Sequence, residues 1–251
     1  MYLEKRIIIF VGAFGSGKTE IALNYVQVLA AQQEKVAIAD LDIVSPYFRS
    51  RDVIKKLTAQ GIEVIAPPGE LAQADLPIIV PRIQGAFDDH ELKVVVDVGG
   101  DDIGATALGR FSEQLSLLPH ELLLVVNTYR PFTKDVHGIK KMLATIEKAT
   151  HLNVTGLVAN SNLGSETTPE VVKNGLDIIR TAAEELSVPV VGVGVRKDLV
   201  SAVGDLKVPL FPITITLLPP WYTNPIITRD RRAVMAAQAT LADHADHLEK
   251  Q

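Results

Sequence analysis

A glycine-rich loop that ends in a lysine and a threonine is the strongest chemical signal in the sequence. It reads Gly12-Ala-Phe-Gly-Ser-Gly-Lys-Thr19 and fits the pattern G-x-x-x-x-G-K-[ST]. Glycines let the backbone curl so that successive N–H groups face one anion, and a following helix start adds unpaired N–H groups. In such a loop the lysine reaches the β- and γ-phosphates of a nucleotide, and the hydroxyl binds Mg²⁺. The residues predicted to bind a nucleotide here are Gly12, Gly15, Ser16, Gly17, Lys18 and Thr19.

Two carboxylates end apolar runs elsewhere in the chain and offer the oxygen ligands that Mg²⁺ prefers. Asp40 ends the run that begins at Lys35, and Asp97 ends the run that begins at Lys93, just before Gly99 and Gly100. Open α/β sheets bind ligands at the carboxyl ends of their strands. We therefore predict that Asp40 and Asp97 help to hold the metal, and that the Gly100 backbone approaches the γ-phosphate. The next two residues, Asp101 and Asp102, are expected to be solvated loop charges.

The composition excludes several other kinds of site. The 251 residues contain no cysteine, which excludes disulfides, thiolate zinc sites, cysteine-ligated iron–sulfur clusters and thiol catalysis. The hydrophobic fraction of 47% is enough for a core, and a net charge of −5 without a long basic run gives no nucleic-acid signature. No apolar run approaches the roughly 20 residues of a membrane helix, and no signal peptide precedes the first apolar run. We therefore expect a soluble, cytoplasmic protein without a membrane anchor.

The glycine-rich loop joins an apolar run, Ile7–Val11, to a helical segment, Thr19–Ala31, and this alternation continues along the chain. Apolar runs that are continuous favour strands of a parallel sheet covered on both faces. Further strands are predicted at 35–40, 62–66, 93–97, 122–127, 154–160 and 188–195, and further helices at 52–60, 104–118, 133–150 and 169–186. Strands and helices that alternate in this way form βαβ units. The predicted fold class is α/β: a single P-loop NTPase domain over residues 1–251, Rossmann-like and three-layered, with a mostly parallel sheet and helices on both faces.

Three segments fit this alternation less well. Prolines in the segment Leu76–Pro81 argue against a central strand, and residues 82–87 are compatible with a helix. Prolines cluster again in residues 208–225, around Trp221, where we predict no regular structure beyond a short edge strand. Residues 229–250 are predicted to form a terminal helix that packs on the parent domain or on a second subunit.

The glycine-rich loop, Asp40-Leu-Asp42 and Asp97-Val-Gly-Gly100 together resemble the CobQ/CobB/MinD/ParA branch of P-loop nucleotide-binding proteins. The resemblance covers most of the chain, from about Arg6 to Asp198. It implies that Asp42 orients the water that attacks the nucleotide, which makes Asp42 catalytic together with Lys18.

The resemblance also bears on the nucleotide base. Asn160, at the end of a late strand, matches the asparagine that contacts the base in that family. Residues 192–198 resemble the family's segment beside the base, although its proline is missing.

One departure from the family concerns dimerisation. The family's loop carries a lysine that reaches across a dimer to the partner's nucleotide, and here Ala13 stands at that position. A lysine-bridged dimer is therefore not implied, whereas a homodimer through other surfaces stays open. Arg49 and Arg51 follow in the segment that would act as a switch, but they are expected to be ordinary solvated arginines.

The resemblance implies a Mg²⁺-dependent ATP-binding protein that hydrolyses ATP slowly as a switch. An alternative is an ATP-dependent small-molecule kinase or ligase resembling dethiobiotin or cobyrinate synthases, with Tyr47, Arg49, Arg82 and Arg130 as candidate residues of an acceptor pocket. A GTPase is disfavoured because Val126–Arg130 lacks the lysine and aspartate of an N-K-x-D guanine-reading motif. A non-enzymatic nucleotide-binding module remains if Asp42 is not catalytic. Besides the nucleotide, the partner is then either another protein or a small-molecule acceptor.

Overall fold

The structure is a computed structural model that describes residues 3–41, 51–66, 76–100 and 102–216. Residue contacts group Met1–Thr214 into one compact unit, to which the whole sheet belongs. The predicted helix at 229–250 lies outside the described residues. The extent of a single domain over residues 1–251 therefore stays a prediction.

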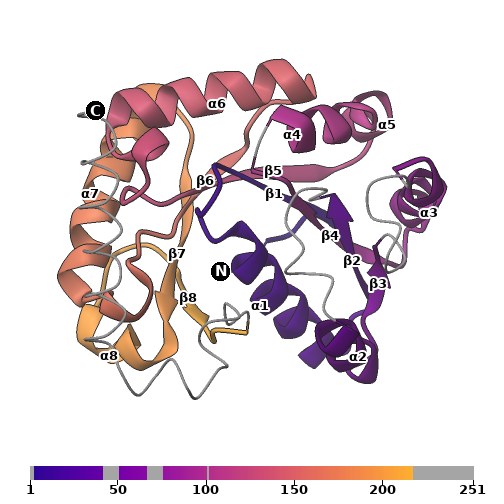
Figure 1. The fold of residues 1–251 in the computed structure, drawn as a ribbon, viewed down its shortest axis with the longest axis horizontal. Coiled ribbons are helices and arrows are strands. Elements are labelled where there is room, and N and C mark those ends of the chain that lie inside the picture. The colour runs from indigo at the N-terminus through magenta and orange to yellow at the C-terminus, as the bar shows by residue number, and fades with distance from the viewer. Residues whose placement is uncertain (1–2, 42–50, 67–75, 101, 217–251) are drawn as a thin grey trace, which may run out of the picture. The chain divides into compact units, whose positions relative to one another are not determined.

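An eight-stranded sheet forms the centre of this unit (Figure 1). Its strand order is β3-β2-β4-β1-β5-β6-β7-β8, and all neighbouring strands run parallel. The strands are β1 (Ile7–Val11), β2 (Val36–Leu41), β3 (Glu63–Ile65), β4 (Lys93–Val98), β5 (His120–Val126), β6 (Gly156–Ala159), β7 (Val190–Arg196) and β8 (Leu210–Ile213). The parallel α/β fold predicted from the continuous apolar runs is thus confirmed.

The helices connect these strands, as the alternation in the sequence predicts. Those that the structure describes are α1 (Lys18–Ala31), α2 (Arg51–Ala59), α3 (Leu76–Asp88), α4 (Asp102–Gly109), α5 (Ser112–Ser116), α6 (Val136–Thr150), α7 (Pro169–Leu186) and α8 (Val200–Val203). Among them, none combines the length and the apolar character needed to cross a membrane.

Strand β1 lies in the middle of the sheet and is buried along its whole length, between β4 and β5. Because side chains alternate along a strand, Ile7 and Ile9 point to one face and Phe10 to the other. Ile7 and Ile9 share a core cluster with apolar residues of α3 to α7. Phe10 packs edge-on against Tyr25 of α1, with ring centroids 6.0 Å apart. Helices therefore cover both faces, which confirms the three-layer prediction.

The single helix predicted over residues 104–118 is wrong, because the chain forms two helices, α4 and α5, with a break between them. Gly109 ends α4 so close to α6 that an added Cβ atom would lie 2.7 Å from the Ala149 carbonyl oxygen. Phe111, in the break, is buried and packs edge-on against Phe87 of α3 at 5.7 Å. The burial of the Phe111 ring favours a change of chain direction between α4 and α5.

Helix α3 begins earlier than the segment 82–87 that was compatible with a helix, and it contains Pro81. A proline inside a helix removes one backbone hydrogen bond. The following turn anchors the helix, because Ile83 and Phe87 are completely buried. The expectation that the prolines exclude a central strand is confirmed.

Strand β8 is the short edge strand expected in the proline-rich segment, and it contains the exposed Pro212. Where β8 ends, the side-chain amide of Asn24 from α1 pairs with the backbone of Thr214. Its Nδ2 donates to the Thr214 carbonyl at 3.0 Å, and its Oδ1 accepts from the Thr214 N–H at 2.9 Å. Tyr25 adds an edge-on contact to Phe211 of β8. Helix α1 is therefore fastened to the far edge of the sheet.

Candidate nucleotide site

The glycine-rich loop leaves the carboxyl end of β1 and enters α1 at Lys18, so it has the strand–loop–helix context of a phosphate loop. Gly15 and Gly17 have φ angles of 75° and 85°. These values lie in the left-handed region, where residues with a Cβ atom are strained. The loop shape predicted from the glycines is thus present in the backbone.

Two side chains from neighbouring strand ends donate hydrogen bonds to carbonyl groups of this loop. Asn160, just after β6, donates from Nδ2 to the Ser16 carbonyl at 2.8 Å. Arg130, a few residues after β5, donates from Nε to the Gly15 carbonyl at 2.9 Å. Within the loop, the Ser16 N–H donates to the Ala13 carbonyl at 3.0 Å. Three contacts therefore fix the two central peptide groups of the loop.

The loop and the start of α1 offer hydrogen-bond donors to an anion. No side chain among the described residues caps the start of α1, where backbone N–H groups and the positive end of the helix dipole favour an anion. Ser16 is fully buried, and its hydroxyl has no hydrogen-bond partner among the described residues. A phosphate group would satisfy such donors, so the loop fits the group that its sequence predicts.

Lys18 and Gly100 lie close together beside the loop. Lys18 is only 4% exposed. An added Cβ atom on Gly100 would lie 2.9 Å from the Lys18 Nζ and 2.7 Å from the Phe14 backbone nitrogen. Gly100 follows β4, so the segment after β4 closes directly onto the phosphate loop. Any residue other than glycine at position 100 would clash with Lys18 and with the Phe14 backbone at this close approach.

Asp40 and Asp97 lie opposite each other on adjacent parallel strands. Asp40 in β2 is the register partner of Asp97 in β4, and their residues are 1% and 0% exposed. Thr19, in the first turn of α1, is half-buried. Among the described residues, no three histidine or acidic side chains gather as a metal site. The residues predicted to hold Mg²⁺ offer two carboxylates and one hydroxyl, whose chemistry suits this ion, and their role as ligands stays a prediction.

Several predicted residues lie outside the described part of the chain. They include Asp42, the predicted catalytic carboxylate, together with Tyr47, Arg49 and Asp101. Asp102 begins α4. Arg82 forms an exposed ion pair with Glu63, with 3.2 Å between Nη2 and Oε1. Among the described residues, Arg82 has no hydrogen bond or ion pair with the phosphate loop. Of the four residues named for an acceptor pocket, Arg130 alone is seen to contact the loop within the described residues.

Arg196 connects the two segments predicted to lie beside the base, the loop after β6 and the end of β7. Arg196 ends β7 and forms two hydrogen bonds to the Asp198 carboxylate, from Nε at 2.6 Å and from Nη2 at 2.8 Å. Its Nη1 donates to the carbonyls of Gly164 and Ser165, in the loop after β6. The hydrogen bonds from Arg196 lower the pKa of Asp198 below its ordinary value. Arg196 therefore holds the two segments together.

Asn160 was predicted to contact the base, and this remains a prediction. Its residue is 8% exposed, and an added Cβ atom on Gly17 would overlap its Nδ2. Its Oδ1 faces Gly194 of β7, where an added Cβ atom would lie 2.6 Å away. The sequence did not predict the hydrogen bond from Asn160 to the Ser16 carbonyl, because the position of a residue at a strand end does not specify which neighbour its side chain contacts.

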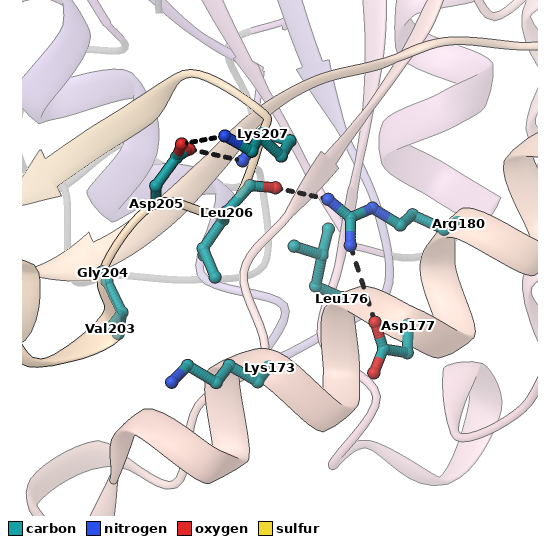
Figure 2. A pocket seen from close by; sticks show the side chains of 9 residues that line it. All are labelled: Lys173, Leu176, Asp177, Arg180, Val203, Gly204, Asp205, Leu206 and Lys207. Carbon is teal, nitrogen blue, oxygen red and sulfur yellow. Dashed lines mark hydrogen bonds and ion pairs between the residues drawn. The ribbon is translucent and has the colours of Figure 1, made fainter.

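A second hollow lies away from these residues, between α7, α8 and the segment that leads into β8. Its volume is about 500 Å³, and Figure 2 shows the residues that line it. Its charged groups largely pair with each other: Arg180 contacts Asp177 and the Leu206 carbonyl, and Lys207 contacts Asp205. None of the predicted site residues lines this hollow.

Comparison with solved structures identifies the same fold in proteins of distant sequence. Chloroplast FtsY from Physcomitrella patens superposes with a TM-score of 0.54 and 21% identity, over 78% of this chain and 60% of that one. FtsY from Thermotoga maritima gives 0.50 and 21%, over 75% and 61%. The signal recognition particle receptor FtsY from Elizabethkingia anophelis, in complex with GDP, gives 0.52 and 18%, over 78% and 58%. This chain thus spans about 60% of the length of these proteins.

Sequence comparison gives the family. No curated protein matches the chain significantly. The profile of the CobQ/CobB/MinD/ParA nucleotide binding domain matches residues 7–207, which include the phosphate loop, both buried aspartates and Asn160. The protein therefore belongs to the CobQ/CobB/MinD/ParA family of nucleotide-binding domains.

Proposed function

We propose that the protein binds ATP together with Mg²⁺ and hydrolyses it slowly, as a nucleotide-controlled switch. The observation that carries this proposal is that Lys18, Gly100 and the phosphate-loop backbone converge at one point. Asp40 and Asp97 lie on the strand pair that leads to Gly100. A buried ammonium group costs free energy unless an anion compensates it, so the site is suited to a phosphate.

Each residue has a distinct role in this proposal. Lys18 and the loop N–H groups stabilise negative charge on the β- and γ-phosphates. Thr19, Asp40 and Asp97 would hold Mg²⁺, which supplies further positive charge for the phosphate oxygens. Asp42 orients the attacking water, as the family resemblance implies. Asn160 is proposed to contact the base, and its hydrogen bond to Ser16 also supports the loop.

Adenine is the proposed base. Asp198 is the acidic residue nearest in sequence to the end of β7. Both oxygens of its carboxylate accept hydrogen bonds from Arg196. Guanine recognition commonly uses a free carboxylate to accept hydrogen bonds from the base, and the N-K-x-D motif is missing. The GDP complex of the E. anophelis FtsY favours the alternative of a guanine nucleotide. That protein shares only 18% identity with this chain.

Titration with fluorescent ATP, with and without Mg²⁺, tests the proposal. We expect saturable binding that strengthens with Mg²⁺ and that unlabelled ATP reverses at lower concentration than GTP. GTP that competes better than ATP would overturn the choice of base. A protein that binds neither nucleotide would overturn the function.

Replacing Asp42 with alanine should slow single-turnover ATP hydrolysis by about 100-fold or more, the usual contribution of a side chain that orients or deprotonates the attacking group. Binding of ATP should change little, because the water is not part of the ground-state contact with the loop. Asp101→Ala serves as the matched control and should hydrolyse ATP at the wild-type rate. Unchanged hydrolysis in Asp42→Ala would assign the water to another residue, and no hydrolysis in the wild type would favour a binding module.

The dimer and the location of the protein belong to the same proposal. Ala13, at the position of the family's bridging lysine, is 1% exposed, so its methyl group packs inside the loop. We propose that ATP does not produce a lysine-bridged dimer and that any homodimer uses other surfaces. Sedimentation with a non-hydrolysable ATP analogue tests this. A tight dimer that the analogue induces and that Arg49→Ala or Arg51→Ala abolishes would contradict it, because a switch arginine would then have replaced the bridging lysine. We also propose a cytoplasmic location.

A further inference from the structure

Arg130 lies against the phosphate loop in a defined orientation. Its Nε donates to the Gly15 carbonyl at 2.9 Å. An added Cβ atom on Gly15 would lie 2.8 Å from this Nε, 3.3 Å from Cδ and 3.4 Å from Cζ. The plane of the guanidinium group therefore rests where a side chain on Gly15 would otherwise project.

The backbone that carries Arg130 is held in place by a buried turn. The Arg130 N–H donates to the Asn127 carbonyl, and the Arg130 carbonyl accepts from the Thr133 N–H, both at 3.1 Å. Asn127 is fully buried, and its Oδ1 accepts from the N–H groups of Tyr129 and Asn162. The Thr133 hydroxyl donates to the Asn127 carbonyl at 2.8 Å. Arg130 thus projects from a fixed turn, and less entropy is lost when it binds a ligand.

The terminal nitrogens of Arg130 differ from those of Arg6, Arg180 and Arg196. Arg6 donates to three backbone carbonyls, and Arg180 and Arg196 each contact a carboxylate and a carbonyl. Among the described residues, no hydrogen bond or ion pair is recorded for Nη1 or Nη2 of Arg130. The side chain is half-buried beside the loop, and its terminal donors stay available.

The topology places Arg130 and Gly100 on opposite sides of the phosphate loop. Gly100 follows β4 and Arg130 follows β5, and these two strands flank β1. Lys18 lies beside Gly100, so it is the cation on the β4 side. Arg130 is a second cation on the β5 side, and a guanidinium group offers paired N–H donors that suit phosphate oxygens.

We propose that Arg130 binds the phosphate chain of the nucleotide through its terminal nitrogens while its Nε holds Gly15 in place. This inference rests on the proposed function. It assigns to the site a second positively charged phosphate ligand that the phosphate-loop motif does not include. It also gives a second reason for glycine at position 15, beside its φ angle of 75°, because a Cβ atom there would crowd the guanidinium group.

Affinities of ATP, ADP and AMP for Arg130→Ala, measured over a range of KCl concentrations, test this inference. Loss of one charge-assisted contact should weaken ATP binding by about 10- to 100-fold. AMP should lose less, and the dependence of ATP affinity on salt should become shallower. Arg130→Lys keeps the positive charge but loses the hydrogen bond from Nε to Gly15. The dependence of its ATP affinity on salt should therefore be close to that of the wild type. Arg110→Ala removes an exposed arginine that follows α4, away from the phosphate loop in sequence, and should bind as the wild type does.

The outcomes separate this inference from the proposed function. Equal losses for ATP, ADP and AMP with unchanged salt dependence would mean that Arg130 only supports Gly15, and would overturn the inference. Wild-type affinity in Arg130→Ala would overturn it as well. Failure of the wild-type protein to bind any of the three nucleotides would instead refute the proposed function, together with the inference built on it. Thermal unfolding of each variant shows whether the fold is intact.

Discussion

Lys18→Ala should abolish Mg²⁺-dependent ATP binding, or weaken it by at least about 100-fold. The ammonium group is expected to contact two phosphates, and each charge-assisted hydrogen bond contributes about 1.5–3 kcal/mol. Two such contacts correspond to about two to four orders of magnitude in affinity. A methyl group replaces neither. Isothermal titration of both proteins with ATP measures the difference.

The stability of the nucleotide-free protein distinguishes lost binding from lost folding. Lys18 is 4% exposed, and removal of a buried cation should leave the thermal midpoint unchanged or raise it. ATP should raise the midpoint of the wild type but not that of the variant. Lys140→Ala removes an equal charge from an exposed ion pair with Glu185 and should retain full binding. Tight ATP binding by Lys18→Ala would refute the assignment of the loop.

Gly17→Ala is the second substitution with a large expected effect. A left-handed backbone conformation costs about 1–2 kcal/mol for a residue with a Cβ atom. The new methyl group would also overlap the Asn160 amide and break its hydrogen bond to Ser16. The loop can relieve both effects only by changing shape. We expect ATP affinity to fall by about 100-fold, because the loop N–H groups no longer converge on the phosphates.

Gly61→Ala is a matched control for this experiment. Gly61 lies between α2 and β3 and has a φ angle of 79°, close to the 85° of Gly17, but an added Cβ atom there would meet nothing within 4 Å. The variant should therefore lose only the backbone term, about 1–2 kcal/mol of stability, and keep its affinity for ATP. Similar affinity losses in both variants would show that general destabilisation, and not the shape of the phosphate loop, lowers the affinity.

The sequence was sufficient for the parts of the site that follow from chain order. A glycine-rich loop between a buried strand and a helix predicts a phosphate loop, and the structure has this arrangement. Asp40 and Asp97 end two apolar runs, and parallel strands bring such ends to one edge of the sheet. Their pairing in register depends in addition on β2 and β4 being neighbours, which chain order does not specify.

Other features depend on contacts that are distant in sequence. The Arg130–Gly15 and Asn160–Ser16 hydrogen bonds join residues more than a hundred positions apart, so no local pattern indicates them. The break after Gly109 depends on the tight packing of that residue on α6 and on the burial of Phe111. In each case a tertiary contact decides among conformations that the local sequence allows equally well.

The short strands at the two edges of the sheet limit how these molecules can associate. An edge strand exposes unpaired backbone groups on which another chain can continue the sheet, a common route to aggregation. Here β3 contains three residues, and β8 contains four, with a proline among them that has no N–H to donate. Beyond β8, the Asn24 amide already occupies the Thr214 backbone groups that an incoming strand would need. Within the part of the chain that the structure describes, neither edge offers a long template for strand addition, and this disfavours the joining of two copies into one continuous sheet.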